Sequence, residues 1–228
     1  GILALAVALA ALAALIAQPV FLSASDTYRS QADPERLKKS VKDLVSAYGE
    51  RDFAHRANLE KIADALREQL LTATPRVTEQ PFKVDEGVFK NIFAEFGPET
   101  GPMVIVGAHY DAISNDDGHA TARGAEDNGS GSTGVLELAR IFTANPPDAT
   151  MKFICYAGEE QGLYGSIAHA QSLVTSGDNA KVRGMFNLDM IGYTGDTDLD
   201  CRLETRAIGQ GLMDACSAAA AQYTTLRI

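Results

Sequence analysis

A continuous apolar segment, residues 103–108 (MVIVGA), constrains the fold of this chain more than any other feature. It lies between a turn-forming stretch, residues 97–102, and the polar residues 109–111 (HYD). A strand without a polar face is typical of a parallel sheet covered on both sides. Two further predicted strands, residues 151–157 and 182–188, follow at intervals that leave room for helices. The alternation predicts an α/β fold: a mixed, largely parallel central sheet with helices on both faces.

Capping residues and apolar spacing predict the remaining elements. A first helix is expected to begin with Asp33 as its N-cap and Pro34 at its first position, and to end at Gly49. Pro75 and Pro81 are expected to bracket a short strand. Further helices are predicted near residues 59–70, 135–142, 163–175 and 208–223, and further strands near residues 88–96 and 201–205.

The N-terminal segment differs from the rest of the chain. Residues 1–17 contain no polar side chain, and the first charge is Asp26. The segment resembles a secretory signal peptide with a cleavage site near residues 23–25, or a membrane anchor about long enough to span a bilayer. The signal peptide is the favoured interpretation, so residues 1–25 are separated from the catalytic domain, residues 26–228. Either interpretation predicts an exported protein, periplasmic or extracellular, that contacts a membrane only if residues 1–22 remain as an anchor.

Charge and cysteine content narrow the class of function. The net charge of −10, from 20 Lys and Arg against 30 Asp and Glu, argues against nucleic acid as a partner, because phosphate contacts need clustered Lys and Arg. The excess of carboxylates is compatible with a cation site. The three cysteines Cys155, Cys201 and Cys216 show no CxxC spacing and can form at most one disulfide.

Polar residues follow three of the predicted strands. In open α/β sheets, ligands bind beyond the carboxyl ends of the strands. The polar residues at these ends and in the Gly-rich loop that leads into a helix are His109, Asp111, Asp127, Glu159, Glu160 and Asp189. Carboxylates crowded together repel one another and take up protons unless a cation compensates them. Histidine with carboxylates is a zinc ligand set, and two metal ions that share a carboxylate occur in hydrolytic sites.

Four segments carry a resemblance to a known family. They are VGAHYD (106–111), GAEDNGSG (124–131), CYAGEEQGLYGS (155–166) and FNLDMIGY (186–193). In this order they resemble the signature segments of the zinc aminopeptidases related to aminopeptidase Y and the bacterial leucyl aminopeptidases. Glutaminyl cyclases belong to the same wider family. The resemblance is close over about residues 100–195, looser over residues 33–96, and implies a zinc exopeptidase-like fold.

The resemblance implies a pair of Zn²⁺ ions and a ligand set for each. His109 and Asp189 resemble ligands of the first ion. Asp127 resembles the carboxylate that bridges both ions, and Glu160 resembles a ligand of the second.

Two further residues resemble catalytic groups that bind no metal. Glu159 is similar to the general base. Asp111 is similar to the acid that accepts the second ring N–H of the ligand His109 and fixes its tautomer.

The chain departs from the family pattern at the second ion. The family completes that site with a histidine downstream of the Asp189 segment, whereas no histidine follows His169 here. Three histidines are poor candidates for this role: His55 before the second helix, His119 in a hydrophilic loop, and His169 on a surface or packing face of a helix. We therefore expect a catalytic domain that is incomplete at its C-terminus and whose second site lacks a histidine.

The implied activity is that of a zinc metallopeptidase, an aminopeptidase that hydrolyses N-terminal residues from peptides with a free N-terminus. Two alternatives stay open. One is acyl transfer of the glutaminyl cyclase kind, which a single-zinc site would favour. The other is a non-catalytic, peptidase-like interaction domain, which would show substitutions at the ligand positions.

Overall fold

The computed structural model describes residues 32–113, 124–193, 195 and 200–228. The predicted signal peptide or anchor lies outside these residues, and so does His119. Within the described ranges, no helix combines the length and the apolar character that a membrane crossing needs.

A five-stranded sheet with strand order β1-β2-β4-β3-β5 forms the centre of the domain. Its strands are β1 (Val77–Val84), β2 (Gly87–Phe96), β3 (Met103–His109), β4 (Thr150–Tyr156) and β5 (Val182–Asn187). β3 pairs in parallel with β4 and with β5. β2 pairs antiparallel with β1 and with β4, so it alone runs against the other strands. The predicted mixed, largely parallel sheet is confirmed.

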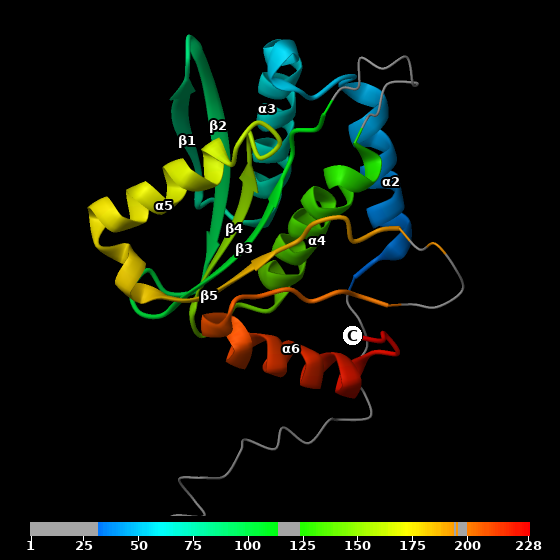
Figure 1. The fold of residues 1–228 in the computed structure, drawn as a ribbon, viewed down its shortest axis with the longest axis vertical. Coiled ribbons are helices and arrows are strands. Elements are labelled where there is room, and N and C mark those ends of the chain that lie inside the picture. The colour runs from blue at the N-terminus through cyan, green and yellow to red at the C-terminus, as the bar shows by residue number, and fades with distance from the viewer. Residues whose placement is uncertain (1–31, 114–123, 194, 196–199) are drawn as a thin grey trace, which may run out of the picture.

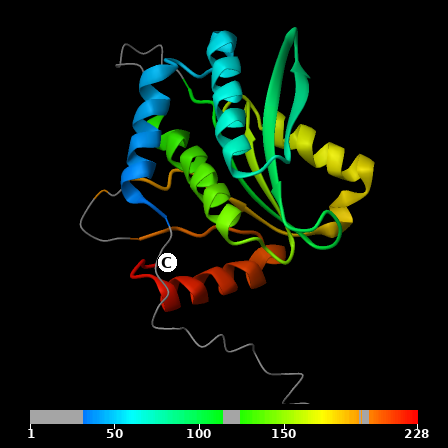
Figure 2. The ribbon, with the colours of Figure 1, turned by 180° about the vertical axis from the view of Figure 1, so that it is seen from behind.

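Helices cover both faces of this sheet, as predicted. They are α2 (Pro34–Ala47), α3 (Arg56–Ala73), α4 (Gly131–Ala144), α5 (Tyr164–Ser176) and α6 (Gln210–Tyr223). α5 lies on the face that is nearer the viewer in Figure 1, whereas α2, α3 and α4 lie on the opposite face, seen in front in Figure 2. α6 contacts the edge strand β5, where Leu212 packs against Gly184.

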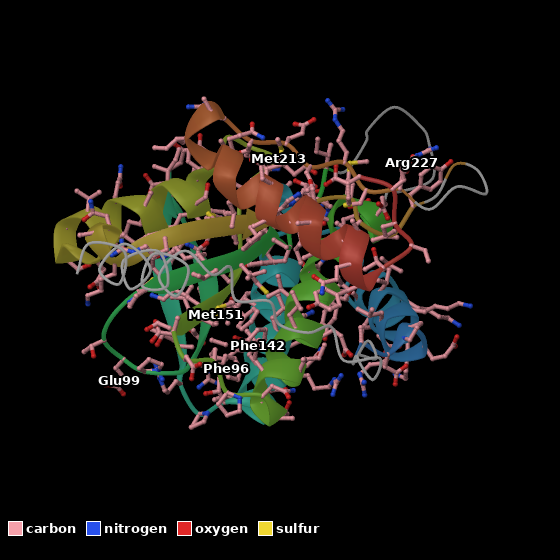
Figure 3. The ribbon with its side chains drawn as sticks, turned by 90° about the horizontal axis from the view of Figure 1, so that it is seen from below. Phe96, Glu99, Phe142, Met151, Met213 and Arg227 are labelled. Carbon is pink, nitrogen blue, oxygen red and sulfur yellow. The ribbon has the colours of Figure 1, made fainter. Side chains whose placement is uncertain are left out.

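The main core lies between the sheet and the layer of α3 and α4. Its buried members include Ile62, Leu66, Leu70, Ile92, Ala108, Val135 and Phe153. Figure 3 shows Phe96, Met151 and Phe142 gathered at one end of this core, where β2 ends and β4 begins. The rings of Phe96 and Phe142 lie 5.5 and 5.4 Å from the ring of Phe153. Because burying one such side chain contributes about 1.5–3 kcal/mol, this core anchors the sheet that carries the site.

Two local details show how the sequence sets the elements. Asp33 caps α2, because its Oδ1 accepts hydrogen bonds from the backbone amides of Glu35 (3.0 Å) and Arg36 (3.1 Å). The prediction that Pro81 ends the first strand was wrong: β1 continues through Pro81, opposite Lys90. β1 pairs only with β2 and is an edge strand, where a missing backbone N–H is tolerated.

The strand predicted near residues 201–205 is not formed. Only an isolated bridge is present beside this stretch, between Asp200 and Arg227. Residues 201–206 have no sheet partner in the part of the chain that the structure describes. A β-type pattern alone does not make a strand, because a strand needs a neighbour with which to share its backbone hydrogen bonds.

Candidate metal centre

The predicted ligands meet at one edge of the sheet. β3, β4 and β5 are parallel neighbours, so their carboxyl ends point the same way. β3 ends at His109, the loop after β4 carries Glu159 and Glu160, and Asp189 follows β5. Asp127 lies in an irregular segment, η2 (Ala125–Ser130), that leads directly into α4. The arrangement is the one expected for a ligand site of an open α/β sheet.

His109 is at the centre of the cluster. Its side chain is 2% exposed, and its Nε2 lies 3.1 Å from Asp127 Oδ1 and 3.7 Å from Asp189 Oδ1. Glu159 Oε2 lies 4.0 Å from the same nitrogen. One ligand atom each from His109, Asp127 and Asp189 lie within 4.8 Å of one another, and so do those of His109, Glu159 and Glu160. All four predicted metal ligands and the predicted base therefore face one small volume.

The charges in this volume are poorly compensated by the protein alone. Burial raises the pKa of Glu160 to about 7, and the negative charge of Asp127 adds to the effect. Burial also raises the pKa of Asp189 and of Glu159. Burial lowers the pKa of His109, but the surrounding carboxylates outweigh it and bring that pKa to about 9. A divalent cation would relieve this crowding, and an imidazole with carboxylates is a donor set that suits Zn²⁺.

Asp111 is fully buried and holds two parts of the site. His109 Nδ1 lies 3.1 Å from the backbone carbonyl oxygen of Asp111 and 3.7 Å from its carboxylate. A hydrogen on Nδ1 leaves Nε2 free to bind a metal. The Asp111 carboxylate accepts hydrogen bonds from the backbone amides of Glu159 and Glu160, both 3.2 Å long. The family resemblance predicted a contact between His109 and the Asp111 carboxylate, whereas the nearer contact is with the Asp111 carbonyl. The contact of the carboxylate with the two loop amides was not predicted.

Asn128 is a structural residue of the site that sequence reasoning missed. Its peptide bond to Asp127 is cis, and its fully buried side chain donates to the backbone carbonyl of Leu188. Two neighbours in η2 make similar contacts: Ser130 Oγ accepts from Ile191 N (3.0 Å), and Glu126 Oε1 accepts from Gly192 N (3.1 Å). Alternate residues of η2 thus hold the segment after β5, while Asp127 faces His109. In the sequence, Asn128 indicates only a turn.

The connection between α2 and α3 packs against the loop that carries Glu159, a contact that no sequence pattern predicted. Phe53 packs against Gly158, where an added Cβ would lie 2.5 Å from the ring, and Gly158 adopts a positive φ of 73°. The same ring stacks on Phe89 at a centroid distance of 3.8 Å. The backbone that introduces Glu159 is therefore held close to a rigid aromatic surface. Arg51, two residues before Phe53, is buried beside the loop after β3.

The other described histidines lie apart from this cluster. The two ring nitrogens of His55 each lie 2.9 Å from a carboxylate oxygen, of Glu50 and of Asp52. His169 lies on the buried side of α5, where its Nδ1 lies 2.9 Å from the hydroxyl of Tyr156. Of the two positions predicted for His169, a surface or a packing face, the structure shows the packing face. Among the residues that the structure describes, His109 is the histidine that groups with the site carboxylates.

Fold and site together define an α/β domain with a histidine–carboxylate cation site at the carboxyl ends of its parallel strands. Residues 91–227 match peptidase family M28, and the chain belongs to that family.

Curated relatives agree with this assignment. The chain is 37% identical over 169 residues to the uncharacterized protein YfbL of Escherichia coli, covering 71% of this chain and 51% of that protein. It is 32% identical over 203 residues to a probable leucine aminopeptidase of Trichophyton verrucosum, covering 82% and 54%. The chain thus spans about half the length of the curated relatives it matches.

Solved structures share the fold. LapB of Legionella pneumophila superposes with a TM-score of 0.68 at 21% identity, covering 86% of this chain and 55% of that one. A glutaminyl cyclase of Porphyromonas gingivalis superposes with a TM-score of 0.70 at 22% identity, covering 86% and 76%. The predicted zinc exopeptidase-like fold is confirmed.

Proposed function

We propose that this chain carries the catalytic site of a metal-dependent aminopeptidase, which hydrolyses the N-terminal residue of peptides with the help of two zinc ions. The observation that carries the proposal is the placement of His109 within 3.1 Å of Asp127 and 4.0 Å of Glu159. Membership of peptidase family M28 supports hydrolysis of peptides. Relatives named probable leucine aminopeptidase support the choice of an exopeptidase.

The donor set suggests how the metal would be held. His109, Asp127 and Asp189, which the structure groups together, would bind the first ion. By the family resemblance, Asp127 and Glu160 would bind the second. When bound, zinc polarises the scissile carbonyl and lowers the pKa of the attacking water. The protein holds this set in place through the Asp111 carbonyl beside His109 and through the side chains of η2.

Glu159 is the proposed general base. A hydrogen bond from its backbone amide to the Asp111 carboxylate holds the loop from which its side chain reaches the site. Burial raises its pKa above the usual value, which improves a carboxylate as a proton acceptor. Glu159 would take a proton from the attacking water and deliver it to the amine that leaves the scissile bond. Because the same carboxylate takes up and gives back the proton, Glu159 is deprotonated again at the end of the cycle.

The surplus of acid at the site suits a substrate that carries a positive charge. Carboxylates there would attract the free α-ammonium group of a peptide and disfavour a blocked N-terminus. An exported location, suggested by residues 1–25, is part of the same proposal.

Hydrolysis of chromogenic anilides tests the function. With excess Zn²⁺, the purified protein should release the anilide from a free N-terminal amino acid and leave the N-acetylated anilide intact. A chelator should abolish the reaction, and added Zn²⁺ should restore it. Cyclisation of an N-terminal glutaminyl peptide without hydrolysis would replace the proposal with acyl transfer. Failure to bind zinc would replace it with an interaction domain.

A further inference from the structure

Arg51 has no part in the catalytic scheme, yet it is the bulkiest fully buried side chain in the described structure. It is 1% exposed and lies in the connection between α2 and α3. A charged side chain is seldom buried to this extent unless polar groups are arranged around it. The connection crosses the upper end of the molecule in Figure 1, the end toward which β4 runs.

Three hydrogen bonds link Arg51 to the segments that carry the predicted ligands. Its Nε donates to the carbonyl of Tyr110 (3.0 Å), and its Nη2 donates to the carbonyl of Gly124 (2.8 Å). Its own carbonyl accepts from the amide of Ala112 (3.0 Å). Tyr110 lies between His109 and Asp111, and Gly124 immediately precedes η2. One guanidinium group therefore connects the loop after β3 with the segment that contains Asp127.

The Gly124 end of this link leaves little room for movement. Gly124 has a φ of 57°, and an added Cβ would lie 2.5 Å from Arg51 Nη2 and 2.5 Å from the carbonyl oxygen of Asp127. Its carbonyl accepts a second hydrogen bond from Gly129 N (2.9 Å). Arg51 thus joins the closed turn on which Asp127 is displayed. A planar guanidinium with fixed donor directions sets the geometry of two carbonyls at once, which an ammonium cannot do.

The charge of Arg51 and its hydrogen bonds should have opposite effects on metal binding. Burial lowers the pKa of Arg51 to about 10, against the attraction of Asp111 and Asp127, so the side chain is a cation at neutral pH. A fixed cation beside the carboxylates repels a metal ion. If Arg51 served only as a countercharge, its removal would strengthen metal binding. If it serves to hold the ligands in register, its removal would weaken metal binding.

We propose that Arg51 is a positioning residue, which fixes the His109 and Asp127 segments relative to each other and so sets the affinity of the site for metal. The inference rests on the metal site of the proposed function. Its test therefore measures metal affinity and backbone exchange, which do not require the protein to hydrolyse peptides.

The test compares Arg51→Lys, which keeps the charge, with Arg51→Met, which keeps much of the bulk. Zn²⁺ affinity is measured by competition with a chelator well below the melting temperature, and Co²⁺ absorption reports the ligand geometry. Both variants should bind Zn²⁺ about 10- to 100-fold more weakly, as is typical when residues that support metal ligands are lost. Arg76→Lys is the matched control, because Arg76 also donates to a backbone carbonyl, that of Gly97 (2.6 Å), at the far end of the sheet. It should leave the affinity unchanged.

Parental affinity in Arg51→Lys would overturn the proposal. Tighter binding in Arg51→Met would overturn it as well, because it would indicate a countercharge. A lower melting temperature with unchanged Zn²⁺ affinity would also contradict the proposal, because it would indicate that Arg51 has a purely structural role. Hydrogen exchange of the metal-free protein gives a second reading, in which Arg51→Lys should speed exchange in residues 106–113 and 124–131. Unchanged exchange would contradict the inference, whether or not the parent chain binds zinc. A parent chain that bound no zinc would instead contradict the proposed function.

Discussion

The side-chain amide of Asn128 donates a 2.8 Å hydrogen bond to the backbone carbonyl of Leu188. Asn128 follows Asp127, and Leu188 precedes Asp189. This one contact therefore joins the two backbone segments whose carboxylates flank His109. Because the Asn128 side chain is fully buried, the contact is shielded from competing water. The spacing of two predicted ligands of the first ion is therefore controlled by a residue that binds no metal.

Replacing Asn128 tests this control. Asn128→Ala removes the donor to Leu188 and the acceptor of Gly131 N (2.9 Å). We expect the free energy of unfolding to fall by about 1–3 kcal/mol, because a buried polar group loses its partner. Zn²⁺ affinity should fall as well. Asn128→Asp keeps the acceptor and loses the donor, so it should lie between Ala and the parent in both urea unfolding and metal titration. Full metal affinity in both variants would refute the controlling role.

Variants of Glu159 and Glu160 should distinguish an effect on turnover from an effect on metal binding. Glu159→Gln removes a proton acceptor and no predicted ligand, so metal content should stay near that of the parent protein. Turnover of the anilide should fall by about 10²- to 10⁴-fold, the usual contribution of general acid–base catalysis. Metal analysis and steady-state kinetics on the same preparation decide the matter. Zinc loss with activity retained would exchange the roles of the two glutamates.

Metal stoichiometry should depend on which carboxylate is changed. In the proposed assignment, the first ion would have His109, Asp127 and Asp189, which the structure groups together. The second would have only Asp127 and Glu160 among the described residues. We expect one tightly bound and one weakly bound zinc, because three protein ligands are typical of a catalytic zinc. Asp127→Asn should weaken both ions, and Glu160→Gln only the weaker one. Equilibrium dialysis distinguishes these outcomes, and equal losses in the two variants would argue against a bridging Asp127.

Stability should depend on pH through Glu137, a buried carboxylate on α4. Burial raises its pKa, but hydrogen bonds from Arg140, Arg36 and the Asp33 amide outweigh this and lower it from 4.5 to about 2. A lowered folded-state pKa stabilises the fold above pH 4.5, and this contribution disappears as the pH falls through about 2. Glu137→Gln should be less stable than the parent at neutral pH and should lose less stability on acidification. Thermal melts from pH 6 down to about pH 2 measure the difference, and parallel curves would contradict it.

Local patterns were sufficient to predict much of the fold and the grouping of the site. The apolar segment before His109 predicted β3, and Asp33 predicted the start of α2, because both signals depend on neighbouring residues. Since the carboxyl ends of parallel strands share one edge, the polar residues after β3, β4 and β5 were expected to meet, and they do.

Sequence reasoning failed where a residue acts across the fold. Arg51 contacts a carbonyl 73 positions away and Asn128 one that is 60 positions away, and no local pattern encodes either contact. The strand predicted at residues 201–205 depended on a partner that the pattern does not supply. The hydrogen bonds that the Asp111 carboxylate accepts from two amides of the next loop were likewise not predicted.

The parallel pairing of β3 with β5 has a consequence for how the protein acquires its metal. His109 ends β3 and Asp189 follows β5, and the two strands become neighbours only after α4, β4 and α5 have been made. The set formed by His109, Asp127 and Asp189 therefore cannot assemble in a nascent chain until β5 has docked beside β3. Metal binding at this set is thus expected to follow the docking of β5, so the order of folding would determine when the protein takes up its ion.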